Sequence, residues 1–156
     1  MQNIITRAVP TGVWVVTARA GEKINGMTAA WATQVSFKPP LVAVAIAPPR
    51  FTHALIKDSG YFCLNLLADD QKEIAKHFGF KSGRKVDKFK GIGFENGPKG
   101  SPILKDAVAY VECELKDTFI TGDHDLFVGE VVDAAELKEG VRPLIFRWED
   151  FFGKKS

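Results

Sequence analysis

The stretch NGMTAAWATQVSFKPP, residues 25–40, is the most informative part of this chain. An apolar run precedes it and a second apolar run, residues 41–47, follows it, so we expect two strands to frame it. Its small residues let another group approach the main chain closely, and its hydroxyl and amide side chains supply hydrogen-bond donors and acceptors. This composition is typical of a polar ligand site and favours a phosphate or an extended heteroaromatic ring.

Short apolar runs separated by Gly, Pro and Asp continue on both sides of this stretch and predict a mainly β fold. Residues 20–23 predict the turn of a hairpin. We expect two helices, one over residues 53–58 capped by Thr52 and one over residues 70–78 capped by Asp69. An antiparallel barrel with a few short helices is the simplest assembly. The strands are expected at residues 12–18, 41–47, 61–67, 107–115, 126–132 and 143–148.

Two polar residues stand out on the expected strands. Alternation along residues 61–67 places Asn65 opposite the apolar stripe, so we expect its side chain to look outward at a ligand or a partner. The same reasoning places Glu112 on the outer face of residues 107–115. The connection over residues 79–102 is unusually long for a compact domain, which favours a functional loop.

Length and composition narrow the function classes. The 156 residues are enough for one domain, which we expect to cover residues 1–156. A net charge of +2 argues against nucleic acid or an anionic membrane as partner, and the apolar runs are too short to span a bilayer. With no signal-like N-terminus, we expect a cytoplasmic protein. Cys63 and Cys113 are expected to be reduced and buried, and we expect no metal site because the histidines lack ligand spacing.

The long loop carries a cluster of positive charge. Lys81, Ser82, Arg84, Lys85 and Lys88 could meet the hydroxyls of residues 28–36 to form an anion site. The pattern is neither a Walker loop nor a dinucleotide fingerprint. A solvated basic loop is the alternative interpretation.

His124 lies in the turn Gly-Asp-His-Asp, residues 122–125, and is the clearest single candidate for chemistry. A histidine beside carboxylates can hold one tautomer and can titrate near neutrality. The alternative is a turn histidine that merely bonds its neighbouring aspartates.

The chain resembles the flavin reductase-like proteins, which bind FMN in a split β-barrel. The resemblance rests on the ordered pattern N-G-M-T-A-x-W…Q-V-S-F-x-P-P-L together with Phe51-Thr52-His53, the run S-G-Y-F with Asn65, Asp87-Lys88-Phe89 and the Gly-Asp-His-Asp turn. It covers residues 5–150 and implies an antiparallel split β-barrel of mainly β structure.

The resemblance also implies site residues. His124 would lie beside the flavin and the nicotinamide as the catalytic residue. Trp31 would lie against the ring, although a core or interface role suits it equally well. The FMN-binding residues implied are Asn25, Met27, Thr28, Ala29, Ala30, Trp31, Gln34, Val35, Ser36, His53, Asn65, Ser82, Arg84, Lys88 and Phe89.

The implied activity is hydride transfer from NADH or NADPH to flavin, with electrons passing to a monooxygenase, ferric iron or another redox protein. The resemblance also implies a homodimer with FMN at the interface, for which Trp14, Trp31 and Tyr61 are candidates. One alternative is a flavoredoxin-like FMN carrier with little direct NAD(P)H activity. Another is a barrel that binds nucleic acid through its basic loop, which the small net charge disfavours.

Overall fold

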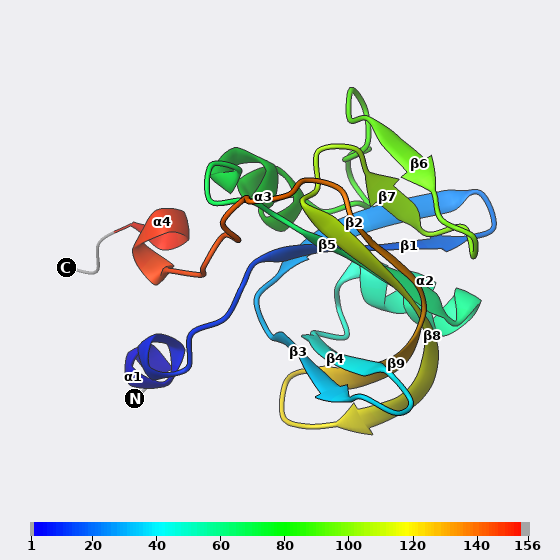
Figure 1. Ribbon diagram of the computed structural model, residues 1–156, viewed down its shortest axis with the longest axis horizontal. Coiled ribbons are helices and arrows are strands. Elements are labelled where there is room, and N and C mark those ends of the chain that lie inside the picture. Colours follow the sequence, from blue (N-terminus) through cyan, green and yellow to red (C-terminus); the bar gives the residue numbers. More distant parts are fainter. Residues whose placement is uncertain (1, 154–156) are drawn as a thin grey trace.

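Seven antiparallel strands form one strongly curved sheet in the computed structural model, which describes residues 2–153 (Figure 1). Strand β2 contacts β4 across the curl, but the strand order gives β2 and β3 no shared ladder, so the barrel is split. This arrangement confirms the predicted mainly β, antiparallel fold. The strand order is β2 (Lys23–Ala29), β1 (Trp14–Ala20), β5 (Tyr61–Leu66), β8 (Ala109–Ile120), β9 (Asp125–Glu136), β4 (Leu41–Ile46) and β3 (Ala32–Ser36).

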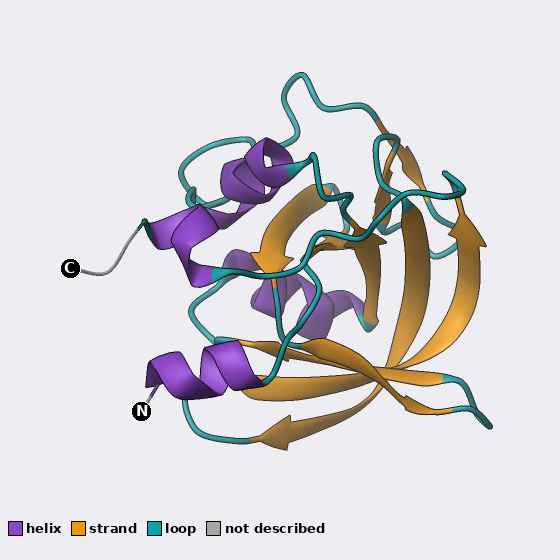
Figure 2. Cartoon of the chain, turned by 60° about the vertical axis from the view of Figure 1, so that its left-hand side comes forward, coloured by secondary structure: helices purple, strands orange, loops and turns teal. Residues whose placement is uncertain are grey.

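Four helices and a small hairpin accompany this sheet, one helix inside its curl and the other elements outside it. Helix α2 (Phe51–Ser59) lies inside the curl and packs on β1, β2 and β5 (Figure 2). Helix α3 (Lys72–Gly79) covers β2, and the hairpin of β6 (Phe94–Asn96) and β7 (Pro102–Leu104) covers β1 and β5. Helices α1 (Gln2–Ala8) and α4 (Trp148–Phe152) lie on one side of the molecule, near the two ends of the chain.

The curved sheet buries both of its faces along β1, where four consecutive residues are inaccessible to solvent. Val16 and Ala18 point into the barrel and pack with Phe62, Phe127 and the helix residue Ile56. The alternate residues point outward into a second core beneath α3 and the hairpin, formed by Val13, Val15, Leu67, Ala75, Phe78, Phe89, Leu104, Ala107 and Leu144. Alternation along one strand therefore supports two cores at once.

Strands β1 and β4 frame residues 25–40 as expected, and most of the stretch between them is β structure as well, which was not expected. Residues 23–29 pair along their whole length with β1, and residues 32–36 pair with β4. Threonine favours strand geometry, and alanine tolerates it when a neighbouring strand supplies the ladder, because tertiary pairing outweighs its weak β propensity.

Both helix caps differ from the prediction. Helix α2 begins one residue before Thr52, which is fully buried and accepts a 3.0 Å hydrogen bond from the Asn25 amide. Helix α3 begins after Gln71 rather than after Asp69, and the Gln71 side chain accepts a hydrogen bond from the Ala68 N–H instead. At the other end of α2, Gly60 adopts a left-handed conformation, as the sequence predicts.

Two further segments depart from expectation. Residues 143–148 form no strand and meet the rest of the fold through two isolated bridges, because Pro143 lacks a donor and the chain turns into α4. The long connection over residues 79–102 contains β6, which pairs with β7. Helix α1 was not anticipated from the sequence.

Asn65 and Glu112 lie on the outer face of the sheet, as alternation predicts, but both are fully buried, so the expectation that Asn65 looks outward at a ligand or a partner is wrong. The hairpin of β6 and β7 covers the outer face of the sheet, where these side chains lie. The Asn65 amide donates to the Val15 carbonyl and accepts from the Leu104 N–H at 2.8 Å. The Glu112 carboxylate accepts hydrogen bonds from the N–H groups of Lys99 and Ser101. Both polar side chains therefore anchor the hairpin to the sheet.

Candidate functional site

Two cavities adjoin between the start of α2, the end of α3 and the strand β2. One, of about 250 Å³, is lined mainly by polar and cationic side chains. The other, of about 300 Å³, is lined mainly by apolar and aromatic side chains. Arg50, Gly79 and Phe80 line both, so the two cavities are neighbouring parts of one site. We call them the cationic cavity and the apolar cavity.

The cationic cavity carries four positively charged side chains and, among the described residues that line it, no carboxylate. Unbalanced positive charge in a partly desolvated hollow attracts anions. A phosphate group fits both the charge and the supply of hydrogen-bond donors. The lining residues are Asn25, Pro49, Arg50, Phe51, Gly79, Phe80, Lys81, Ser82, Gly83, Arg84 and Lys88.

Lys88 is the most deeply placed of these charges, with 2% of its surface exposed. Its ammonium group donates to the carbonyl oxygens of Gly26, at 2.9 Å, and Phe78, at 2.8 Å. Burial, and secondarily the positive charge of Arg50, lower the pKa of Lys88 to about 8. An ammonium has three N–H donors, so one remains for a ligand after these two bonds.

The other cations are held by backbone and ring contacts. The Arg84 guanidinium donates to the Pro49 carbonyl at 2.7 Å and lies over the Phe51 ring. Lys81 donates to His77 Nδ1 at 3.2 Å, while His77 Nε2 donates to the Lys88 carbonyl at 2.7 Å. These contacts leave the positive charges uncompensated while fixing where they lie.

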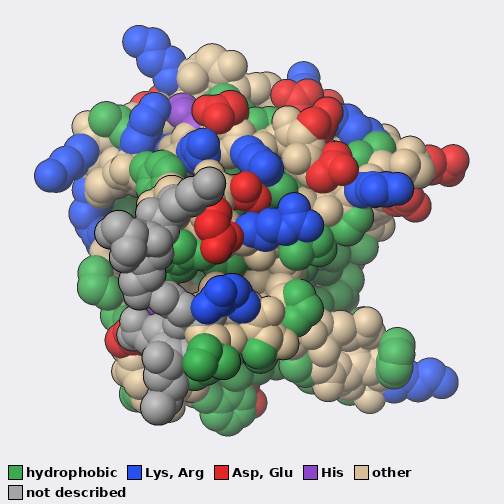
Figure 3. Space-filling model, turned by 90° about the vertical axis from the view of Figure 1, so that its left-hand side faces the viewer, with side chains coloured by type: hydrophobic (Ala, Val, Ile, Leu, Met, Phe, Trp, Pro, Cys, Tyr) green, Lys and Arg blue, Asp and Glu red, His purple; other side chains and the backbone are tan. Residues whose placement is uncertain are grey.

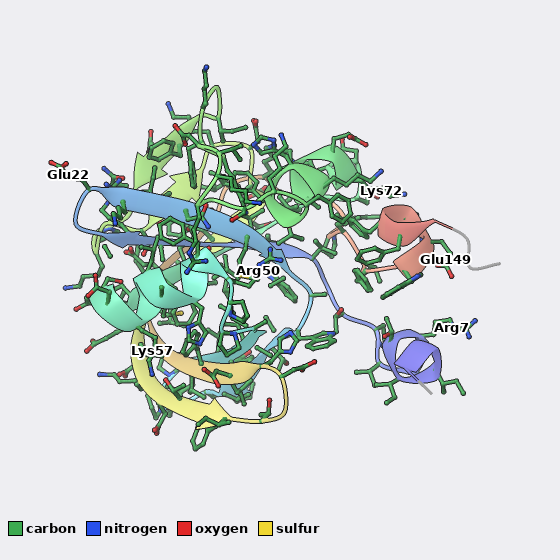
Figure 4. The ribbon with its side chains drawn as sticks, turned by 180° about the vertical axis from the view of Figure 1, so that it is seen from behind. Arg7, Glu22, Arg50, Lys57, Lys72 and Glu149 are labelled. Atoms are coloured by element: carbon green, nitrogen blue, oxygen red, sulfur yellow. The ribbon has the colours of Figure 1, made fainter. Side chains whose placement is uncertain are left out.

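Arg50 lies at the N-terminal end of α2 (Figure 4), and it lines both cavities. A cation at this end of a helix opposes the helix dipole, and burial lowers the pKa of Arg50. Both costs are offset if an anion binds beside it. Arg50 is therefore a candidate binding residue, and its position directly before a helix and after Pro48-Pro49 is the sequence signal that could have revealed it.

The apolar cavity combines small side chains with large flat ones. Alanines on β2 and β4 leave its floor open, because a methyl group fills so little of the space between the strands. Gly79 lies where the two cavities adjoin. A Cβ at this position would come within 3.2 Å of the Thr28 Cβ, so a larger residue would crowd the connection between the cavities. The lining residues are Thr6, Met27, Thr28, Ala29, Ala30, Trp31, Ala45, Ala47, Arg50, Ala75, Gly79, Phe80, His124, Phe146, Trp148, Phe151 and Phe152.

His124 and Trp31 stand together at the edge of the apolar cavity, with ring centroids 4.7 Å apart and planes tilted by 49°. The Asp123 carboxylate accepts a 2.7 Å hydrogen bond from His124 Nδ1, and this bond lowers the pKa of Asp123. The bond and the indole contact orient the imidazole. His124 can therefore present a defined ring edge to a ligand.

Most of the residues predicted from the sequence meet at these cavities. Asn25, Ser82, Arg84 and Lys88 line the cationic cavity. The predicted residues that line the apolar cavity are Met27, Thr28, Ala29, Ala30, Trp31 and His124.

Six predicted residues line neither cavity. Gln34, Val35 and Ser36 lie on the edge strand β3. Phe89 packs between Phe78 and Phe94 in the outer core. Asn65 is enclosed by β1 and β7, and His53 is paired with Asp125.

Sequence reasoning missed the aromatic residues near the C-terminus. Four of the seven residues from Phe146 to Phe152 are aromatic and all four line the apolar cavity. They hold one another by ring contacts, such as the 4.3 Å approach of Trp148 to Phe152. This density of aromatic residues in so short a segment was the available signal.

Two other kinds of site find no support in the described part of the chain. Over residues 2–153, no group of three or more His, Cys, Asp or Glu side chains has the arrangement of a metal site. Within the same range, none of the helices has the length and apolar character needed to cross a membrane.

The combined site is suited to one elongated ligand. An anion at Lys88 and a flat, mainly apolar group beside Trp31 and Phe152 would satisfy both halves at once.

Comparisons with known proteins agree with this geometry. The family model for the flavin reductase like domain matches residues 6–154. A solved FMN-binding protein from Thermus thermophilus, with bound 1-cyclohex-2-enone, superposes with a TM-score of 0.79 at 39% identity, covering 86% of this chain and 78% of that one. The Streptomyces globisporus C-1027 NADH:FAD oxidoreductase SgcE6 superposes with a TM-score of 0.86 at 31% identity, covering 93% and 85%.

Among curated relatives, a high molecular weight rubredoxin from Moorella thermoacetica is 38% identical over 140 residues. That alignment covers 86% of this chain but 61% of the relative, so the chain spans less than two thirds of that protein.

The depressed pKa of Lys88 predicts a pH dependence for binding of a phosphate ester such as FMN. Above pH 8 the empty site loses the Lys88 proton, so binding must first restore it and the affinity falls by up to about tenfold per pH unit. Below about pH 6 the phosphate itself becomes monoanionic, so binding also weakens at acidic pH. We therefore expect the tightest binding near pH 7, measured by titration calorimetry.

Riboflavin, which lacks the phosphate, is the matched control and should show no loss of affinity between pH 7 and 9. Lys88→Met should weaken FMN far more than riboflavin and should remove the alkaline fall. Equal weakening of both ligands by Lys88→Met would mean that this side chain does not meet the phosphate.

Proposed function

The chain belongs to the flavin reductase-like family, and we propose that it binds FMN and transfers hydride from NADH or NADPH to flavin. One observation carries the proposal: a cavity with four cations and a cavity lined by aromatic rings adjoin through Arg50. FMN has the same two ends, a phosphate dianion and a flat tricyclic ring, joined by a flexible polyol.

The residues of both cavities fit FMN. Lys88 and Arg84 would hold the phosphate, with the hydroxyl of Ser82 as a further partner. Thr28 and the main chain of β2, which line the apolar cavity, would contact the polyol and the polar ring edge. When bound, FMN supplies a ring nitrogen that accepts hydride and a conjugated system that stores two electrons.

The protein would contribute orientation and exclusion of water. Trp31, Phe80 and the aromatic residues of α4 line the apolar cavity, so a nicotinamide stacked beside the flavin would be shielded from solvent on that side. His124, held by Asp123, would contact the nicotinamide or the polar edge of the ring. Direct hydride transfer between the two cofactors needs no protein base, so this role is positioning and charge stabilisation.

A second candidate function is electron carriage without direct reduction by NAD(P)H. The similarity to relatives that are named a high molecular weight rubredoxin and a diflavin flavoprotein, and not a flavin reductase, favours it. The FMN site would be the same, and reduced FMN would pass electrons to a redox protein. A monooxygenase or a ferric complex would be the recipient in the reductase alternative.

We also propose a homodimer. Apolar side chains are exposed over α1 and β3, including Ile5, Val9, Trp31 and Val35, and they border an apolar groove of about 670 Å³. The face that carries α1 and α4 shows hydrophobic side chains gathered in its lower half (Figure 3). The edge strand β3 would then face a second copy, where Gln34, Val35 and Ser36 could reach that copy's flavin. Trp14 and Tyr61 are partly buried within the chain and are weaker interface candidates.

The matched span of the family model, residues 6–154, supports the proposal of a single flavin-binding domain.

The direct test is the visible spectrum of the purified protein supplied with FMN, followed by anaerobic addition of NADH or NADPH. We expect protein-bound flavin that bleaches rapidly with at least one nucleotide. Flavin that stays oxidised with both nucleotides contradicts the reductase and favours the carrier. Failure of the protein to take up FMN contradicts both the reductase and the carrier.

His124→Ala should slow hydride transfer by about tenfold to a hundredfold, because the group that orients the nicotinamide is lost. The affinity for FMN should change by less than about threefold, since the phosphate lies in the other cavity. Stopped-flow flavin bleaching and flavin titration separate the two quantities. An unchanged rate would remove His124 from the site.

For the dimer, sedimentation equilibrium should give twice the 17.2 kDa chain mass at micromolar concentration. Val35→Glu places a charge on the exposed edge strand and should shift the protein to a monomer, because a buried unpaired charge is costly. Ile120→Glu, at an exposed apolar position outside the groove, is the matched control and should leave the dimer intact. A wild-type protein that sediments as a monomer contradicts the proposal.

A further inference from the structure

We propose that His53 and Asp125 form a positioning brace, which holds His124 and Arg50 at a fixed separation on the two sides of the apolar cavity. This inference rests on the proposed function and names two residues that line neither cavity. Their role is to position the groups that do.

The pair is short and enclosed. His53 Nε2 donates to Asp125 Oδ2 at 2.7 Å, and the two side chains are 11% and 15% exposed. The imidazole also packs against the ring of Phe127, with centroids 4.8 Å apart. A hydrogen bond with a charged partner in a desolvated place is strong and directional. It therefore fixes both the distance between the two side chains and their relative orientation.

On one side, the brace ends next to His124. Asp125 is the first residue of β9, and the residues before it form a tight turn in which Thr121 donates twice to the His124 carbonyl. The turn is largely exposed, so packing of its own side chains holds it weakly. Asp125 is the point at which the turn that carries His124 meets the protein interior.

On the other side, the brace ends next to Arg50. His53 lies in the first turn of α2, and its N–H donates to the Arg50 carbonyl at 3.1 Å. Arg50 immediately precedes the helix and lines both cavities. A displacement of His53 would therefore move Arg50 with the helix.

The brace spans the inside of the curl from α2 to β9, and no strand ladder joins these two elements directly. Helix α2 packs mainly on β1, β2 and β5, in one half of the sheet. Strand β9 pairs with β4 and β8. The contacts of His53 with Asp125 and with Phe127 join the helix to the half of the sheet that presents His124.

Four variants test the brace. His53→Leu removes the hydrogen bond, whereas His53→Gln keeps a donor near the position of Nε2. The double variant His53→Leu/Asp125→Leu replaces both polar partners with apolar groups, which restores stability in many buried pairs. Tyr110→Phe is the matched control, because it removes a 2.7 Å hydrogen bond to Asp133, which lies on β9 like Asp125, and neither Tyr110 nor Asp133 lines either cavity.

Two readouts are measured on each variant, together with the midpoint of its thermal unfolding. The first is the NMR spectrum of the Trp31 indole and the His124 ring in protein without flavin. The second is the rate of anaerobic hydride transfer, with FMN affinity measured separately.

We expect His53→Leu and the double variant to shift the Trp31 and His124 signals and to slow hydride transfer by about tenfold to a hundredfold. His53→Gln should stay within about threefold of the wild-type rate, and Tyr110→Phe should leave both readouts unchanged. Persistence of the defect in a double variant of wild-type stability distinguishes positioning from a general loss of stability.

The brace is overturned if the double variant regains the wild-type rate, or if His53→Leu leaves the Trp31 and His124 signals unmoved. If the wild-type protein does not bind FMN, the proposed function fails. The Trp31 and His124 signals of the flavin-free protein still show whether the His53–Asp125 pair positions these two residues.

Discussion

A buried ammonium group holds the candidate site together. Lys88 bonds the carbonyl of Gly26 on β2 and the carbonyl of Phe78 on α3, so one side chain ties the long connection over residues 79–102 to the sheet and to a helix. No carboxylate pairs with it among the described residues that line its cavity. The structure thus carries a charge whose desolvation is only partly offset, and an anionic ligand would complete the compensation. The positions of Arg84, Lys81 and Ser82 depend on the same connection.

The split barrel explains why the site lies where it does. Both faces of the sheet are buried along β1, because α2 fills the inside of the curl and α3 covers the outside. The two ends of the sheet are left unjoined, and the cavities occupy the region where β2, α2 and α3 approach one another. A site in this region draws residues from distant parts of the chain, and its geometry depends on contacts between those parts, such as the one between α2 and β9.

The sequence predicted the fold class and much of the site, because the signals were local. The apolar runs predicted most strands of the antiparallel sheet, and residues 27–31 with His124 do line one cavity. Arg50 and the aromatic residues of α4 were missed, since only the folded chain brings them beside β2. The burial of Asn65 and Glu112 was not foreseen, because alternation separates the two faces of a strand but does not tell which face another layer covers. The assignments of Gln34, Val35 and Ser36 to the flavin remain predictions that require a second copy of the chain.

A crystal structure of the protein with FMN tests the account most directly. We expect the phosphorus atom in the cationic cavity, with a phosphate oxygen within hydrogen-bond distance of Lys88 Nζ, and the ring in the apolar cavity near Trp31 and His124. A phosphate bound elsewhere, or a ring outside the space between Trp31 and the aromatic residues of α4, would contradict it.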